Sequence, residues 1–129
     1  MTIAFICILI ASLLPIIWIG IGKVLGGFSL KNNANPREVI AKTEKGILKR
    51  ANWAQENSWE SFAPFAAAVL IASFLGANQD QVDLFSMIFI SMRVLHGAFY
   101  LANKPLARSI VWFAGMGCNF ALYYLSWNL

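Results

Sequence analysis

The sequence predicts an all-α integral membrane protein built as a bundle of four transmembrane helices. Of its 129 residues, 59% are hydrophobic and only 12% are charged, which is a membrane composition rather than a soluble one. The apolar residues gather into four stretches, joined by one long loop and two short ones. We therefore expect a single membrane domain over residues 1–129, with spans at about 3–25, 46–76, 82–102 and 106–127.

The first stretch, residues 3–25, is long enough to cross a bilayer, which takes roughly 20 helical residues. It has no basic residue before its apolar run and no small-residue cleavage pattern before Lys23. We expect a retained span rather than a cleaved signal peptide. Gly22 and Gly26 form a small-xxx-small pair, which predicts that another helix packs closely against this one.

The second span begins in a polar segment. Residues 28–42 have the composition of an irregular connection, and Pro36 disfavours helix at the residue before it. We expect the charged residues after Arg37 to form the solvated start of one long helix. The apolar run 62–75 is too short to span alone, so this helix must draw Glu60 towards the hydrocarbon. A carboxylate facing lipid costs roughly 2.5 to 3.5 kcal/mol, so we expect Glu60 to face protein.

The third and fourth spans are read from two apolar stretches separated by Pro105, which stops the helix before it. The loop before the third span contains Asp80 and Asp83 and no cation. In contrast, the first loop and the loop around Lys104 and Arg108 are basic. The positive-inside rule then places both basic loops in the cytosol and both termini outside. These cations suit lipid headgroups, and they do not form the basic patch of a nucleic-acid-binding domain.

Both cysteines, Cys7 and Cys118, fall inside expected spans. We expect buried free thiols rather than a disulfide. The sequence has one histidine, no HExxH motif and no cysteine pair, which leaves too few ligands for a metal site.

Polar residues recur at helical spacing on three of the expected spans. Residues spaced three and four apart share one face of a helix. The three stripes are Arg50, Trp53, Asn57, Glu60 and Pro64; then Arg93, His96, Tyr100 and Asn103; then Arg108, Trp112, Gly115 and Asn119.

The first two stripes are expected at one depth. With a rise of about 1.5 Å per residue, Glu60 lies about 24 Å and His96 about 21 Å from the outer surface. Arg93 is within reach of Glu60, either as a structural ion pair or as part of a site, and the sequence leaves both readings open. We expect a pocket open to the cytosol, lined by Asn57, Glu60, His96, Tyr100, Arg108 and Ser109.

These motifs resemble a known family. The pattern Arg-Ala-x-x-Ala-x-x-Asn-x-x-Glu-x-x-x-Pro-Phe from Arg50, then Arg-x-x-His-x-x-x-Tyr from Arg93, then Arg-Ser opening the last helix, is similar to the membrane-associated proteins in eicosanoid and glutathione metabolism (MAPEG). The likeness is strongest to the short bacterial branch, through Pro-Phe-Ala-Ala-Ala-Val-Leu and Leu-Ala-Asn-Lys-Pro-Leu-Ala-Arg-Ser.

The resemblance implies a homotrimer of four-helix subunits in the bacterial inner membrane, with glutathione bound between neighbours near the cytosolic face. Family members act on lipophilic substrates as glutathione transferases, peroxidases or isomerases. By position, Asn57 and Glu60 would hold the glutathione backbone. Arg93, His96 and Tyr100 would line the same cleft, and the catalytic pair Arg108 and Ser109 would face the thiol.

The chain departs from the family pattern at Trp53, where eukaryotic glutathione-using members usually have arginine, and at Ser61, where many have tyrosine. Arg50 lies one turn from Trp53 on the same stripe and would take part in binding glutathione. Two other functions stay open: a non-catalytic lipid-binding or scaffold member of the same fold, and a small proton-coupled transporter. The transporter ranks lower because such proteins usually place their carboxylate in the first span, which has no acid here.

Overall fold

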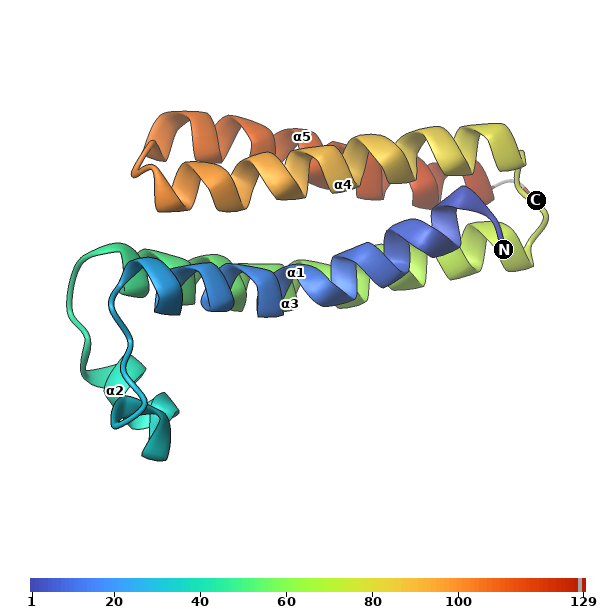
Figure 1. The fold of residues 1–129 in the computed structure, drawn as a ribbon. Helices are drawn as coiled ribbons and strands as arrows, with labels where there is room; N and C mark the ends of the chain where they lie inside the picture. The colour runs from blue at the N-terminus through green and yellow to red at the C-terminus, as the bar shows by residue number, and fades with distance from the viewer. Residues whose placement is uncertain (128) are drawn as a thin grey trace.

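The computed structural model describes residues 1–127 and 129, and this part of the chain contains helices and no strand (Figure 1). There are five α-helices and one 3₁₀ turn, Asn32–Ala34. The α-helices are α1 (Ile3–Leu25), α2 (Pro36–Lys42), α3 (Ile47–Phe74), α4 (Gln79–Leu101) and α5 (Pro105–Ser126). Two of them, α1 and α4, are long and apolar enough to cross a membrane.

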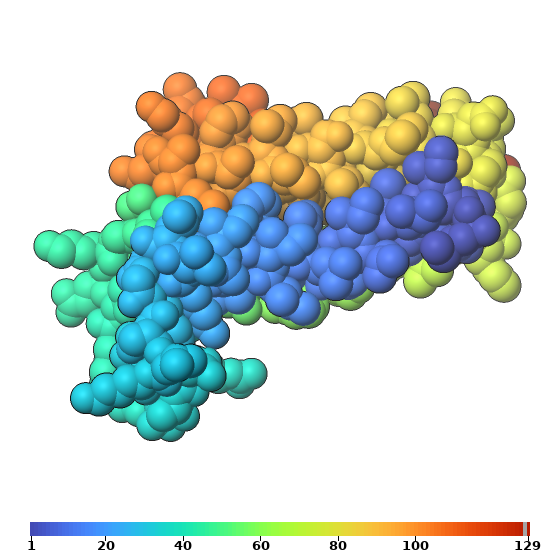
Figure 2. All heavy atoms as spheres, viewed as in Figure 1, coloured from blue at the N-terminus to red at the C-terminus, as the bar shows by residue number. Residues whose placement is uncertain are grey.

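The four long helices lie side by side, with α3 and α4 as the central pair. Helix α1 packs on α3 and α4, whereas α5 packs on α4 and α3. Both termini and the α3–α4 turn lie at one end of the bundle, and α2 and the α4–α5 connection lie at the other (Figure 1). The two basic loops therefore share one end of the molecule. The segment that holds α2 projects from that end (Figure 2).

Small residues let these helices approach closely. A Cβ added at Gly22 would lie 2.2 Å from the Cβ of Ala51, and one added at Gly26 would lie 3.1 Å from the Cβ of Leu48. The close helix contact predicted for the Gly22 and Gly26 pair is therefore confirmed, and the partner is α3. Between α3 and α4, the rings of Phe65 and Phe89 stack with centroids 4.0 Å apart. Close backbone approach and ring stacking both strengthen van der Waals packing, which drives helix association in membranes.

The expected buried thiols are confirmed, because Cys7 and Cys118 are both free and buried. Cys7 belongs to the main hydrophobic cluster, which α1, α3, α4 and α5 all supply; its fully buried members include Ala4, Phe65, Val69, Val82 and Leu122. Both thiols thus act as small apolar side chains in the core.

The prediction of a single long second helix after Arg37 is wrong. Helix α2 ends at Lys42, Thr43 is extended, and α3 begins only at Ile47. The break is made at Gly46, whose φ of 92° lies in the left-handed region that side chains other than glycine rarely adopt. The charged segment is therefore a separate short helix and a turn.

The N-terminus of α1 is held by a contact that the sequence did not predict. Asp83, expected in the loop before the third span, lies one turn inside α4, and its Oδ1 accepts a hydrogen bond from the backbone N–H of Ala4 at 2.8 Å. The first N–H groups of a helix have no partner within the helix, and a carboxylate is a favourable one. Asp83 therefore ties the start of α1 to α4.

Gly97 provides a test of the packing between α1 and α4. A Cβ at this position would lie 2.1 Å from the indole of Trp18, so we expect Gly97→Ala to destabilise the fold by about 1–3 kcal/mol through overpacking. Gly117→Ala is the control, because a Cβ there meets nothing within 4 Å. Thermal unfolding in detergent measures both, and equal midpoints for the two variants would contradict this account.

Candidate functional site

A small cavity lies at the end of the bundle where α4 connects to α5. Its volume is about 190 Å³, and its lining comes from three helices: Asn57, His96, Tyr100, Arg108, Ser109, Trp112 and Phe113. The structure thus brings together five of the six residues expected to share a pocket. The sixth, Glu60, is not among the lining residues.

Arg108 is positioned by the ring of Tyr100. The guanidinium carbon lies 4.3 Å from the centroid of that ring, within the range of a cation–π interaction. The Tyr100 ring in turn meets the His96 ring edge-on, with centroids 5.1 Å apart. Ser109 lies beside Arg108, and its hydroxyl donates to the carbonyl of Pro105 in the same helix. The two aromatic rings therefore support the cation at the cavity wall.

His96 lines the cavity and has a buried ring nitrogen without a hydrogen-bond partner among the described residues. Its residue is only 3% exposed, and its Nδ1 has no hydrogen-bond partner among the described residues. Buried side-chain nitrogens are nearly always hydrogen-bonded in folded proteins. His96 therefore contributes its ring to the cavity wall, whereas its Nδ1 is enclosed by protein.

The prediction of a direct ion pair between Arg93 and Glu60 is wrong, because the two side chains are linked only through Asn57. Arg93 Nη2 donates to Asn57 Oδ1 at 2.8 Å, and Asn57 Nδ2 donates to Glu60 Oε2 at 3.2 Å. Among residues 1–127 and 129, the only ion pair joins Lys42 and Glu38 on the surface. Asn57 therefore relays between the buried cation and the carboxylate, because its amide offers an acceptor to one and a donor to the other.

Glu60 does not face protein within one chain, contrary to the expectation from its depth. It is exposed, whereas Arg93 is only 3% exposed. On a helix of 3.6 residues per turn, a step of three residues turns the side chain by about 60°, which is enough to carry Glu60 past the cavity while Asn57 still reaches it. An exposed carboxylate at this level leaves the site open on one side.

Arg50 and Arg93 lie outside the set of cavity-lining residues. The Nε of Arg50 donates to the carbonyl of Leu101 at 3.2 Å, at the C-terminal end of α4. That carbonyl has no partner within its own helix, so the contact fixes the end of α4 against α3. As observed, Arg50 holds the helices that form the cavity.

The sequence did not identify the aromatic wall of the cavity. Trp112 belonged to the third predicted stripe but was not assigned to the pocket. No sequence pattern pointed to Phe113. The two rings meet edge-on with centroids 5.0 Å apart, and Phe113 is 68% exposed. They give the cavity an apolar side next to Arg108 and Ser109.

The comparison with protein families is decisive for the class of this protein. The sequence model of the MAPEG family matches residues 3–127. The chain belongs to the MAPEG family. A comparison with curated proteins gave no match. Membership in MAPEG, a family of membrane-associated proteins, is consistent with a membrane glutathione transferase or a related activity. Five residues of this MAPEG chain that resemble the family's motifs line the cavity.

The relay through Asn57 can be tested by its effect on stability. In Asn57→Ala the buried guanidinium of Arg93 loses its acceptor, which we expect to cost about 1.5–3 kcal/mol, as for a hydrogen bond to a charged group. Asn52→Ala is the control, because Asn52 bonds only to the exposed Glu56. Chemical unfolding in detergent compares the two, and a loss no greater than that of the control would show that the relay contributes nothing.

Proposed function

We propose that this chain is a membrane-bound, glutathione-dependent transferase or peroxidase that activates a thiol for attack on a lipophilic electrophile. One observation carries the proposal: Arg108, Tyr100 and His96 line a single cavity, and the Tyr100 ring contacts both of the others. Family membership supports the choice of glutathione as the thiol.

The chemistry follows from the residue types. A thiol with a free pKa of about 8.5 is mostly protonated at neutral pH, and a fixed cation beside it favours the thiolate. Arginine stays protonated, so Arg108 stabilises the anion and does not act as a base; the thiol proton leaves to solvent. In transfer, the thiolate sulfur forms a bond to the electrophilic carbon, and the leaving group departs with the electron pair of the broken bond. Ser109, next to Arg108 in the chain, would lie near the sulfur; in this structure its hydroxyl donates to the carbonyl of Pro105.

The size of the cavity bears on how glutathione would fit. Ligand pockets usually measure about 300–1,000 Å³, whereas this one has about 190 Å³. One chain therefore encloses the thiol end, and the rest of the tripeptide extends towards Glu60, whose carboxylate suits its amino group. In the homotrimer that the resemblance to the family implies, a neighbouring copy would close the open side.

The proposed setting is the bacterial inner membrane. Four of the helices, α1, α3, α4 and α5, would span it, with the basic loops in the cytosol and both termini outside. An exposed Phe113 and the other apolar side chains of α5 would then let a lipophilic substrate reach Arg108 from the bilayer.

Arg108 is the residue to test for activation of the thiol. We expect Arg108→Ala to abolish the ultraviolet absorbance of bound thiolate and to lower the rate of conjugation about a hundredfold, as when one stabilising group of an anion is removed. Lys104→Ala removes a cation only four residues earlier, outside the cavity, and is expected to keep both signals. The parent protein with glutathione provides the reference.

Each outcome separates the competing functions. Loss of both signals in Arg108→Ala alone supports the transferase. Absence of a thiolate signal in the parent protein would refute it. Retention of a lipid without turnover would favour a scaffold, and uptake driven by a pH gradient in proteoliposomes would favour a transporter.

Glu60 tests where glutathione lies. We expect Glu60→Gln to weaken glutathione binding about tenfold, because a hydrogen bond to a charged group is lost, and to leave a trimeric mass unchanged. Glu56→Gln is the matched control, since it neutralises an exposed carboxylate one turn earlier on α3, outside the Arg93–Asn57–Glu60 relay. Calorimetry and light scattering in detergent measure the two properties; equal affinities in the two variants would place glutathione elsewhere.

A further inference from the structure

A second and larger cavity lies between the ends of α1, α2 and α3, at the end of the bundle that carries the basic loops. Its volume is about 600 Å³, within the usual range for ligand sites. Its lining shares no residue with the cavity around Arg108. Nothing in the proposed thiol chemistry uses it.

The lining is rich in cations without acidic partners. Three cations and one carboxylate line the cavity: Lys23, Arg37, Lys49 and Glu56. Among the described residues no ion pair involves any of the three cations, and the side chain of Arg37 makes no hydrogen bond there. Glu56 is already engaged, since it accepts a hydrogen bond from Asn52. The cavity therefore has positive charge to offer.

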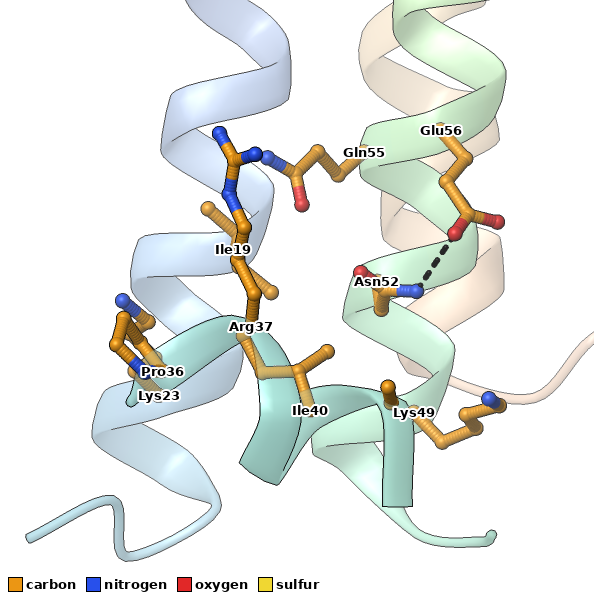
Figure 3. A pocket seen from close by; sticks show the side chains of 10 residues that line it. Ile19, Lys23, Pro36, Arg37, Ile40, Lys49, Asn52, Gln55 and Glu56 are labelled. Carbon is orange, nitrogen blue, oxygen red and sulfur yellow. Dashed lines mark hydrogen bonds between the residues drawn. The ribbon is translucent and has the colours of Figure 1, made fainter. Parts of the chain in front are cut away.

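Figure 3 shows how these groups are arranged. The side chain of Arg37 reaches from α2 into the space between α1 and α3, where its guanidinium points towards the carboxamide of Gln55. Lys23 and Lys49 lie at opposite edges of the cavity, each beside an aromatic ring, Phe28 and Trp53 respectively. A guanidinium and an amide facing one space are the donors that bind a phosphate oxygen.

Apolar side chains continue from this cavity along the bundle. On α1, Ile16, Ile19 and Lys23 are spaced three and four apart, so they share a face; Ile19 lines the cavity and Ile16 is 59% exposed beyond it. On α3, Trp59 lies one turn beyond the lining residue Glu56 and is 47% exposed. A ligand with an anionic head and an apolar tail would match a basic cavity that is followed by exposed apolar side chains.

We propose that the cavity between α1, α2 and α3 binds the phosphate of an anionic phospholipid headgroup, with Arg37 as the main contact and Lys23 at the rim. The acyl chains lie along the exposed faces of α1 and α3. The position of the cavity supports a lipid as the source of the phosphate. In the topology proposed above, the cavity lies where the helices leave the membrane beside basic loops, and anionic lipids concentrate at the cytosolic leaflet.

The test compares two pairs of substitutions that change the net charge equally. The double variant Lys23→Gln, Arg37→Gln removes two of the three lining cations. The double variant Lys31→Gln, Lys45→Gln removes two exposed cations from the connection between α1 and α3 that do not line the cavity. Native mass spectrometry of the detergent-purified assembly, titrated with phosphatidylglycerol, gives the bound fraction. We expect about thirtyfold weaker binding in the first pair, since each of the two basic residues removed contributes about 1 kcal/mol near a membrane surface. We expect nearly parental binding in the second pair.

Three results would overturn the proposal. Equal losses in both pairs would mean that the lipid senses only diffuse surface charge. No retained phosphatidylglycerol in the parent protein would mean that the cavity is closed to lipid, for example by a neighbouring copy. Displacement of the lipid by an equal concentration of glycerol phosphate would assign the cavity to a soluble phosphate, whereas failure to displace it supports the bound acyl chains.

Discussion

The candidate site depends on one buried cation between α3 and α4. Burying a charge is costly unless hydrogen bonds and an opposite charge compensate it. Arg93 is 3% exposed, and its hydrogen bond to Asn57, followed by the bond from Asn57 to Glu60, provides part of that compensation. Its Nε is buried without a partner among the described residues. This requirement permits few rotations or shifts of α4 against α3. His96 and Tyr100, three and seven residues further along, are placed at the cavity as a consequence.

The ends of the helices are fixed by contacts of the same kind. Arg50 binds the last carbonyl of α4, and Asp83 in α4 binds the first turn of α1. Between them, the indole of Trp18 lies directly on Gly97, where no side chain fits. Helix α4 is thus held at both ends and near His96. Such support matters because a catalytic group that is displaced by about 1 Å can lose much of its effect.

Residue spacing predicted much of this arrangement, because a helix of 3.6 residues per turn determines which side chains share a face. The close packing at Gly22 and the grouping of His96, Tyr100 and Arg108 follow from it. Spacing does not determine how each helix is rotated against its neighbours. For that reason the relay through Asn57, the outward direction of Glu60 and the role of Phe113 could not be predicted. The break before α3 was missed because the charged residues on both sides of it were read as one helix, whereas an extended Thr43 and the positive φ of Gly46 separate α2 from α3.

The structure also gives Arg93 and Arg108 different electrostatic partners. Arg93 is linked to a carboxylate through Asn57, so much of its charge is compensated within the chain. Arg108 has the face of the Tyr100 ring as its partner, and among the described residues it forms no ion pair. A ring face attracts a cation without neutralising it. A thiolate in the cavity would therefore meet a cation whose charge is still available, because Arg108 has no carboxylate partner among the described residues and Glu60 is bound by Asn57. This division of roles is the physical reason for assigning anion stabilisation to Arg108 rather than to Arg93.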